Sequence, residues 1–284
     1  MNRGFDNLLK KSLEIWFAED IGEGDHTTLS TVPSSAKGKA RLLVKDKGII
    51  AGLFVVEKLI REFDNQLEME VFLSDGSEIS EGDIVFEIKG PVRSILQVER
   101  LALNLLQRLS GIATQTRDYV ERIKGTNAQI LDTRKTTPGL RFIEKEAVRL
   151  GGGLNHRIGL YDMILIKDNH IDFAGGIENA IKSAKKYLLE KKLDLKIEVE
   201  ARTLQDVEII LRTGIADRVL LDNFSTQLTS EAVKIINGRI ETESSGGIDL
   251  NTIRSYAECG VDYISAGALT HQIRSLDLSL KAFF

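Results

Sequence analysis

The 284-residue chain has few of the residues on which several kinds of functional site depend. Its one cysteine, Cys259, excludes an intrachain disulfide and a cysteine cage for a metal ion. The four histidines do not show the spacing of a helical metal motif, and neither a Ser-His-Asp nor a Cys-His set is evident. Walker and dinucleotide-binding glycine loops are absent as well. Nucleophilic catalysis is therefore not favoured.

Long apolar runs and long basic blocks are also missing. No run approaches the roughly 18 apolar residues that a membrane span needs, and the charged N-terminal segment lacks the apolar centre of a signal peptide. The formal net charge of -4 argues against nucleic acid as the main partner. We therefore expect a cytoplasmic protein that binds neither membrane nor nucleic acid.

Roughly the first ninety residues predict a small α+β unit with an antiparallel sheet. Its predicted elements are helices over 5–19 and 53–63, an extended segment from Thr27–Thr28, a hairpin over 38–52 turning at Asp46-Lys47-Gly48, and strands over 67–73 and 84–88. The unit contains no evident nucleophile, metal cluster or phosphate loop, so we interpret it as a packing or lid domain. Pro91 marks its end, and residues 95–123 predict one or two long helices.

After Gly125 the pattern alternates between strands and helices. The predicted strands are 128–132, 162–167, 195–200, 217–222, 239–243 and 262–266, separated by helices near 140–150, 174–190, 203–213, 226–237 and 249–259. This alternation indicates a parallel sheet with helical crossovers, and the strand count favours an incomplete α/β barrel of six or seven strands. We therefore expect an N-terminal α+β domain over 1–112, a catalytic barrel over 113–269, and a C-terminal helix over 270–284 that packs back on the first domain.

Polar residues, glycines and two alanines lie at or just past the carboxyl ends of the predicted strands. They are Thr133, Arg134, Lys135, Lys167, Glu200, Asp222, Ser245, Gly246, Gly247, Ala266, Gly267 and Ala268. Because the carboxyl ends of parallel strands meet at one face of a barrel, we expect these residues to converge on an active site. The two glycine-containing turns after the last strands are typical of phosphate sites, where backbone N–H groups face the anion.

The basic residues near this face supply charge for anionic groups. Arg134, Lys135, Arg157 and Lys167 suit phosphate or carboxylate, and His156 is a candidate for ligand contact because it precedes Arg157. Ordinary solvated strand ends are the alternative for these cations.

The two acids have several possible roles. Glu200 and Asp222 could hold Mg²⁺ shared with substrate phosphates, bind sugar hydroxyls, or stabilise a cationic transition state. They could also simply pair with nearby lysines. Arg100 and Arg108 lie eight residues apart, on nearly one face of a predicted helix, where a solvated surface is the alternative.

At these residues the chain resembles a known family, and the match runs nearly end to end. The motifs are Glu19-Asp20-Ile21-Gly22-x-Gly24-Asp25, Glu99-Arg100, Asp132-Thr133-Arg134-Lys135-Thr136, Gly151-Gly152-Gly153-x-Asn155-His156-Arg157, Lys167-Asp168-Asn169-His170, Glu198-Val199-Glu200, Leu221-Asp222-Asn223 and Ser245-Gly246-Gly247. In them the chain is similar to the quinolinate phosphoribosyltransferases. The resemblance implies an N-terminal open sandwich, an incomplete α/β barrel, and a homodimer or higher oligomer in which Arg100 reaches the partner's site.

The resemblance also implies a reaction and a role for each candidate residue. Quinolinate and phosphoribosyl pyrophosphate would give nicotinate mononucleotide, pyrophosphate and CO₂, with Mg²⁺, in NAD biosynthesis. Quinolinate would be bound by Arg100, Arg134, His156, Arg157 and Lys167, with Thr133 beside them and Lys135 shared between carboxylate and phosphate. Lys135, Glu200 and Asp222 are the expected catalytic residues. The turns Ser245–Gly247 and Ala266–Ala268 would bind the 5′-phosphate.

Three other functions stay open at this point. The nearest is a phosphoribosyltransferase for nicotinate or a related aromatic acid. A non-catalytic phosphate-binding barrel is the second, and the third is a lyase that uses Lys167 as a Schiff base.

Overall fold

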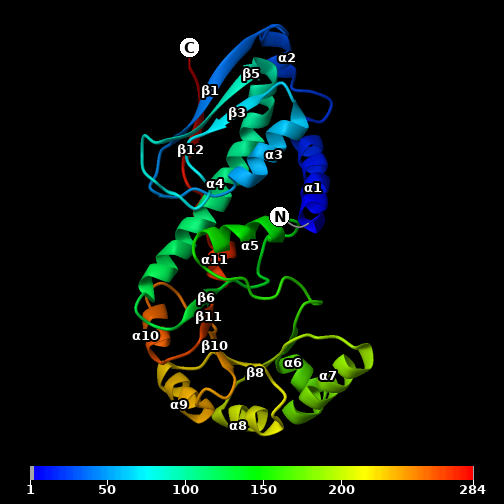
Figure 1. Ribbon diagram of the computed structural model, residues 1–284, viewed down its shortest axis with the longest axis vertical. Coiled ribbons are helices and arrows are strands. Elements are labelled where there is room, and N and C mark those ends of the chain that lie inside the picture. Colours follow the sequence, from blue (N-terminus) through cyan, green and yellow to red (C-terminus); the bar gives the residue numbers. More distant parts are fainter. Residues whose placement is uncertain (1–2, 284) are drawn as a thin grey trace. The chain divides into compact units, whose positions relative to one another are not determined.

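The computed structural model describes residues 3–283, and the chain divides into two compact units (Figure 1). The first comprises the described residues up to Arg117, Thr137–Gly152, and the described residues from Gln272 onward. The second comprises Asp118–Thr136 and Gly153–His271. Residues 137–152 thus group with the first unit, although the sequence pattern places them inside a continuous barrel domain.

The first unit is built on a four-stranded antiparallel sheet in the order β12-β1-β5-β3. These strands are β1 (Lys37–Val44), β3 (Glu68–Val71), β5 (Ile84–Pro91) and β12 (Leu278–Phe283), and the helices of the unit are α1 (Arg3–Ile21), α2 (His26–Thr31), α3 (Leu53–Phe63), α5 (Arg141–Leu150) and the start of α4 (Val92–Arg122). The predicted helices are confirmed, and β3 pairs antiparallel with β5 within the predicted antiparallel sheet. Asp75 caps the N-terminus of α3 from a distant part of the chain. Its carboxylate accepts hydrogen bonds from the N–H groups of Leu53 and Phe54 at 3.0 Å.

Two local predictions in this unit are wrong. Thr27–Thr28 belong to α2 rather than to an extended segment, because the Asp25 side chain accepts a hydrogen bond from the N–H of Thr28 and caps the helix. The segment 38–52 is not a hairpin: β1 pairs with β5 and β12, whereas β2 (Gly48–Ile49) pairs with β4 (Glu78–Ile79). Pairing between distant segments overrides the local turn signal.

The predicted C-terminal helix is also wrong, although its packing on the first unit is correct. Residues 278–283 form β12, which pairs antiparallel with β1 from Lys39↔Phe283 to Val44↔Leu278. The apolar residues of this segment have a helix-like spacing, but the segment forms a strand because pairing satisfies the backbone groups along the free edge of β1.

The second unit is a six-stranded parallel sheet in the order β6-β11-β10-β9-β8-β7. The strands are β6 (Gln129–Leu131), β7 (Ile164–Ile166), β8 (Ile197–Ala201), β9 (Arg218–Asp222), β10 (Glu241–Ser245) and β11 (Tyr263–Ser265). All six were predicted, and because β6 and β7 are the two edges of the sheet, the expectation of an incomplete barrel is confirmed.

Crossover helices join these strands and follow one another along the sheet (Figure 1). They are α6 (Asp168–Phe173), α7 (Ile177–Lys191), α8 (Leu204–Thr213), α9 (Thr226–Ile236) and α10 (Ile253–Glu258), and the short α11 (Ala268–His271) follows β11. Of these, α6 was not predicted as a separate helix. Among the described residues, no helix combines the length and apolarity that crossing a membrane requires.

The parallel sheet has one apolar and one polar face. Val199, Val219 and Thr242 lie in register on the first face and are buried. The other face carries Glu198 and Arg218, which lie opposite each other on neighbouring strands. Parallel strands are usually apolar on both faces, so charged residues on one face are unusual. They indicate a polar interior on that side of the sheet, next to its carboxyl edge.

Candidate active site

Lys135 lies beside the glycine turn that follows β11. Its N–H donates to the Thr133 hydroxyl at 3.0 Å, and its carbonyl accepts a hydrogen bond from the Thr270 hydroxyl at 2.7 Å. A Cβ at Gly267 would lie 2.9 Å from Cδ of Lys135, so the side chain passes directly over this glycine. The structure therefore joins the loop after β6 to the turn after β11, as the strand-end pattern predicts.

Glu200 and Asp222 share the neighbouring part of the edge. The Glu200 side chain lies on β8 and the residue is only 7% exposed. Burial raises the pKa of its carboxyl group, the nearby Asp222 raises that pKa further, and Lys167 at the end of β7 opposes the rise. Two carboxylates and a cation from three adjacent strands thus meet here. Two acidic oxygen donors with room for other ligands fit Mg²⁺, which commonly takes its remaining ligands from water and substrate phosphates.

Two arginines form the second part of the site. Burial lowers the pKa of the Arg157 guanidinium, and the like charge of Arg134 lowers it further, so the two groups lie close enough to repel. Arg157 donates to the carbonyl of Met163 at 3.3 Å. Lys135 and Lys167 form no salt bridge with the described residues. Several cations gathered at one edge are typical of a site for a multiply charged anion.

The turn after β10 lies against Asn223. Gly246 has φ +102°, and a Cβ there would lie 2.9 Å from the Asn223 backbone nitrogen, so the position requires glycine. Asn223 donates its N–H to the carbonyl of Ser245 at 2.9 Å and its side-chain amide to Asp222 at 2.7 Å. The predicted phosphate turn Ser245–Gly247 is therefore linked directly to the predicted acid Asp222.

His156 is buried rather than exposed at the edge. It is 8% exposed, and its Nε2 lies 3.0 Å from Glu198 and 3.4 Å from Glu243. Burial opposes charging of the ring, but the contacts with these two carboxylates outweigh burial and raise the pKa of His156 to about 9. The N–H of Arg157 donates to Nδ1 at 2.7 Å, which favours the neutral ring because an acceptor nitrogen carries no proton. Its predicted contact with ligand stays a prediction.

Sequence reasoning assigned no role to the other members of this buried network. Glu198 and Glu243 are both 0% exposed, and Arg218 donates to Glu243 at 3.0 Å. Burial raises the pKa of Glu198 to about 7, and the adjacent Glu243 raises it as well. Burial acts on Glu243 in the same direction, but His156 and Arg218 hold the pKa of Glu243 below its ordinary value. Charged residues at alternate positions of β8, β9 and β10 were the signal that could have revealed this network.

The two arginines of α4 differ in their surroundings. Arg100 is exposed in the first unit, and its predicted reach into a partner's site stays a prediction. The solvated-surface interpretation of Arg108 is wrong, because it donates to Glu144 at 2.8 and 2.7 Å and to the Thr137 hydroxyl at 2.7 Å. Glu144 also accepts a hydrogen bond from the N–H of Thr137 at 3.1 Å. Arg108 therefore stabilises the chain two residues beyond Lys135.

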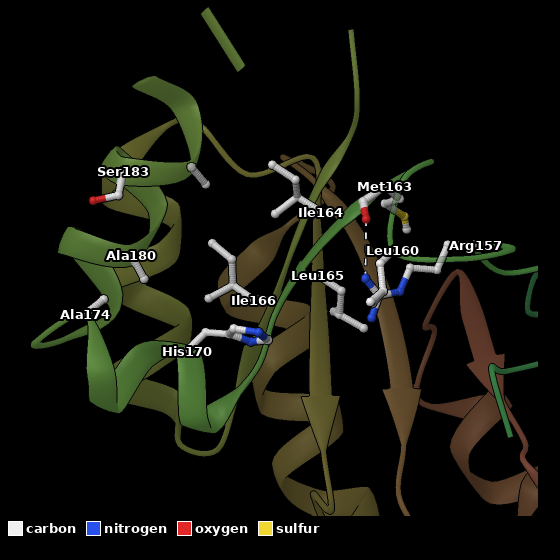
Figure 2. Close-up of a pocket in the computed structure, with 11 residues that line it drawn as sticks. Arg157, Leu160, Met163, Ile164, Leu165, Ile166, His170, Ala174, Ala180 and Ser183 are labelled. Atoms are coloured by element: carbon white, nitrogen blue, oxygen red, sulfur yellow. Dashed lines mark hydrogen bonds between the residues drawn. The ribbon is translucent and has the colours of Figure 1, made fainter. Parts of the chain in front are cut away.

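A cavity of about 360 Å³ lies beside β7, an edge strand of the sheet (Figure 2). Its walls are mostly apolar: Figure 2 shows Ile164 and Ile166 of β7 on the side of Ala180 of α7, whereas Leu165 lies on the side of Arg157. Arg157 lies at its rim, where the guanidinium donates to Met163. The apolar lining does not suit a charged substrate, so we assign the chemistry to the carboxyl edge and not to this cavity.

The fold and site together define a class of protein. It is an incomplete α/β barrel that presents cations, a pair of acids and glycine turns at its carboxyl edge, where barrel enzymes bind phosphorylated substrates. The domain models named "Quinolinate phosphoribosyl transferase, N-terminal domain" and "C-terminal domain" match residues 25–110 and 112–281. The chain therefore belongs to the quinolinate phosphoribosyl transferase family.

Individual relatives agree with this assignment. The chain is 42% identical to the probable nicotinate-nucleotide pyrophosphorylase [carboxylating] of Bacillus subtilis, covering 96% of this chain and 92% of that protein. It is 43% identical to the chloroplastic enzyme of that name from Oryza sativa, covering 96% and 77%.

Solved structures give the same result. NadC from Streptococcus pyogenes is 39% identical with a TM-score of 0.91, covering 97% of both chains. Human nicotinic acid phosphoribosyltransferase is 13% identical with a TM-score of 0.65, covering 90% of this chain and 72% of that one, which shows a shared fold alone.

Proposed function

We propose that this protein transfers the phosphoribosyl group of phosphoribosyl pyrophosphate to quinolinate and releases pyrophosphate and CO₂, giving nicotinate mononucleotide for NAD biosynthesis. The observation that carries the proposal is the meeting of a cationic pocket, two acids and two glycine turns at one sheet edge. The names of the relatives describe the same reaction in those proteins.

Quinolinate is a dicarboxylate, so its binding needs several fixed cations. Arg134 and Arg157 lie close together, and each guanidinium can donate two parallel hydrogen bonds to a carboxylate. Lys167 lies nearer the acids and Lys135 nearer the glycine turn. We assign the arginines and Lys167 to quinolinate, and Lys135 to both a carboxylate and a phosphate.

The phosphoribosyl group fits the other half of the edge. The turn at Gly246 and the turn at Gly267 would present backbone N–H groups to the 5′-phosphate. Glu200 and Asp222 would bind the ribose hydroxyls, Mg²⁺, or both. When bound, Mg²⁺ would neutralise charge on the departing pyrophosphate. The mutual repulsion that raises the pKa of Glu200 is what a bound cation would relieve.

The residues act on charge that develops during the transfer. As the bond from C1 of ribose to pyrophosphate breaks, positive charge develops on the sugar, and Glu200 and Asp222 stabilise it. The pyridine nitrogen forms the new bond to C1 and becomes cationic. The adjacent carboxylate then leaves as CO₂, its electron pair stays on the ring carbon beside this nitrogen, and a proton takes its place. The cationic ring accepts the electrons, so no base is required.

Assembly and location are part of the proposal. We place Arg100 at a partner's site in a homodimer or higher oligomer, which fits its exposure and its position in the other unit. We propose a cytoplasmic location because the one cysteine, Cys259, is free, although several plant relatives are named chloroplastic or mitochondrial.

The test measures nicotinate mononucleotide and CO₂ from quinolinate and phosphoribosyl pyrophosphate, with and without Mg²⁺. Lys135→Ala and Lys167→Ala should each lower kcat/KM by about 100-fold, since each removes a charge that faces the substrates. Lys182→Ala is a matched control because Lys182 forms an exposed pair with Glu178 on α7. Unchanged kcat/KM and quinolinate affinity in both site variants would contradict the cationic-pocket assignment. Equal turnover of nicotinate, without CO₂ release, would instead favour the sister activity.

A further inference from the structure

The buried network beneath the site performs no step of the proposed reaction. It contains two carboxylates, Glu198 and Glu243, which have no solvent exposure, together with Arg218 and His156 at 8% each. Removing charged groups from water is costly, and replacing them with apolar residues is often neutral or stabilising. Stability alone therefore gives no reason for the network.

The contacts form a continuous path from the sheet to the substrate pocket. Arg218 holds Glu243 at 3.0 Å, and Glu243 and Glu198 contact Nε2 of His156 at 3.4 and 3.0 Å. On the other side of the ring, Nδ1 accepts the Arg157 N–H at 2.7 Å. The ring is thus held at both nitrogens, and it fixes the Arg157 backbone relative to β8 and β10.

We propose that Glu198 and Glu243 are positioning residues that act through His156 to hold Arg157 beside Arg134 in the orientation that binds a substrate carboxylate. Two neighbouring guanidinium groups repel each other, so a mobile Arg157 would turn away before substrate arrives. If the Arg157 backbone is already fixed during folding, substrate binding does not have to bring the two repelling guanidinium groups together. The inference rests on the proposed function and adds the residues that set its quinolinate affinity.

The kinetic test compares Glu198→Leu with Glu198→Gln. Leucine fills a similar volume but cannot accept from Nε2, so KM for quinolinate should rise by about 10- to 100-fold. KM for phosphoribosyl pyrophosphate should stay within about twofold, because Glu198 contacts His156 and not the glycine turns. Glutamine keeps an acceptor oxygen and should restore most of the affinity.

The control variant is Thr242→Val. Thr242 lies on the opposite face of β10, is 3% exposed, and contacts Asp262 at 2.7 Å. Its replacement should lower stability without changing either KM, which separates positioning from a general loss of structure. Equal changes of both KM values in Glu198→Leu would overturn the positioning role.

Nuclear magnetic resonance gives a second readout that needs no activity. Since the chain has four histidines, one imidazole N–H that is protected from solvent exchange should be visible and should vanish in His156→Gln. Absence of this signal in the wild type would overturn the inference even if Glu198→Leu does not fold. Failure of the wild type to form nicotinate mononucleotide would overturn the proposed function, whereas an unchanged quinolinate KM in Glu198→Leu would overturn only the positioning role.

Discussion

Replacement of Arg108 by methionine should destabilise the first unit strongly. Glu144 has no solvent exposure, and Arg108 supplies two of its hydrogen bonds, at 2.8 and 2.7 Å. Without the guanidinium, the carboxylate loses these two bonds and keeps the bond from the Thr137 N–H. Breaking a buried ion pair by removal of one member costs about 3–5 kcal/mol. Because the Arg108 side chain is 28% exposed and water can enter, we expect the lower end, about 3 kcal/mol.

The double variant Arg108→Met/Glu144→Met should cost much less than the single one. It removes the uncompensated charge, and the half-buried N–H of Thr137 loses its acceptor, which costs about 1–2 kcal/mol. The double variant should therefore be more stable than Arg108→Met. A simple loss of packing would make the double variant less stable instead.

Chemical unfolding monitored through tryptophan fluorescence would measure this difference. The chain has one tryptophan, Trp16 on α1, so the signal reports the first unit. A loss below about 1 kcal/mol in Arg108→Met, or a double variant less stable than the single one, would refute the account of the buried Arg108–Glu144 pair.

Two further predictions concern the second unit. Because the folded pKa of His156 is raised to about 9, the unfolding free energy that separates wild type from His156→Gln should be largest below pH 6.5 and should shrink as pH rises through 9. A pH-independent difference would show that the Arg157 N–H keeps the ring neutral. Gly246→Ala should cost about 1–3 kcal/mol and weaken phosphoribosyl pyrophosphate binding more than quinolinate binding, because Asn223 must move. Gly247→Ala, which has open space around its Cβ, should perturb the turn less.

The positions of the strands of the second unit along the chain could be predicted well from the sequence. Alternation of strands and helices depends on local hydrophobic periods, so each strand from β6 to β11 lies within or close to its predicted range. The convergence of Lys135, Glu200 and Asp222 on one edge followed, because the carboxyl ends of parallel strands necessarily meet there.

The wrong predictions concern strands whose pairing partners lie far away in the chain. Residues 278–283 pair with β1 across most of the chain, and β1 itself pairs with β5 rather than with β2. No local pattern contains this information, since it depends on which strand edges remain unpaired after the rest of the unit has folded.

The sequence by itself determined the class of fold, the family and the residues at the carboxyl edge, because each depends on local periodicity or on motifs that follow single strands. Only the tertiary structure decided how the buried charged residues are paired. It paired Arg108 with buried Glu144, and it enclosed His156 between Glu198 and Glu243. The physical reason is that burial and pairing of charge depend on groups far apart in the chain, which only folding brings together.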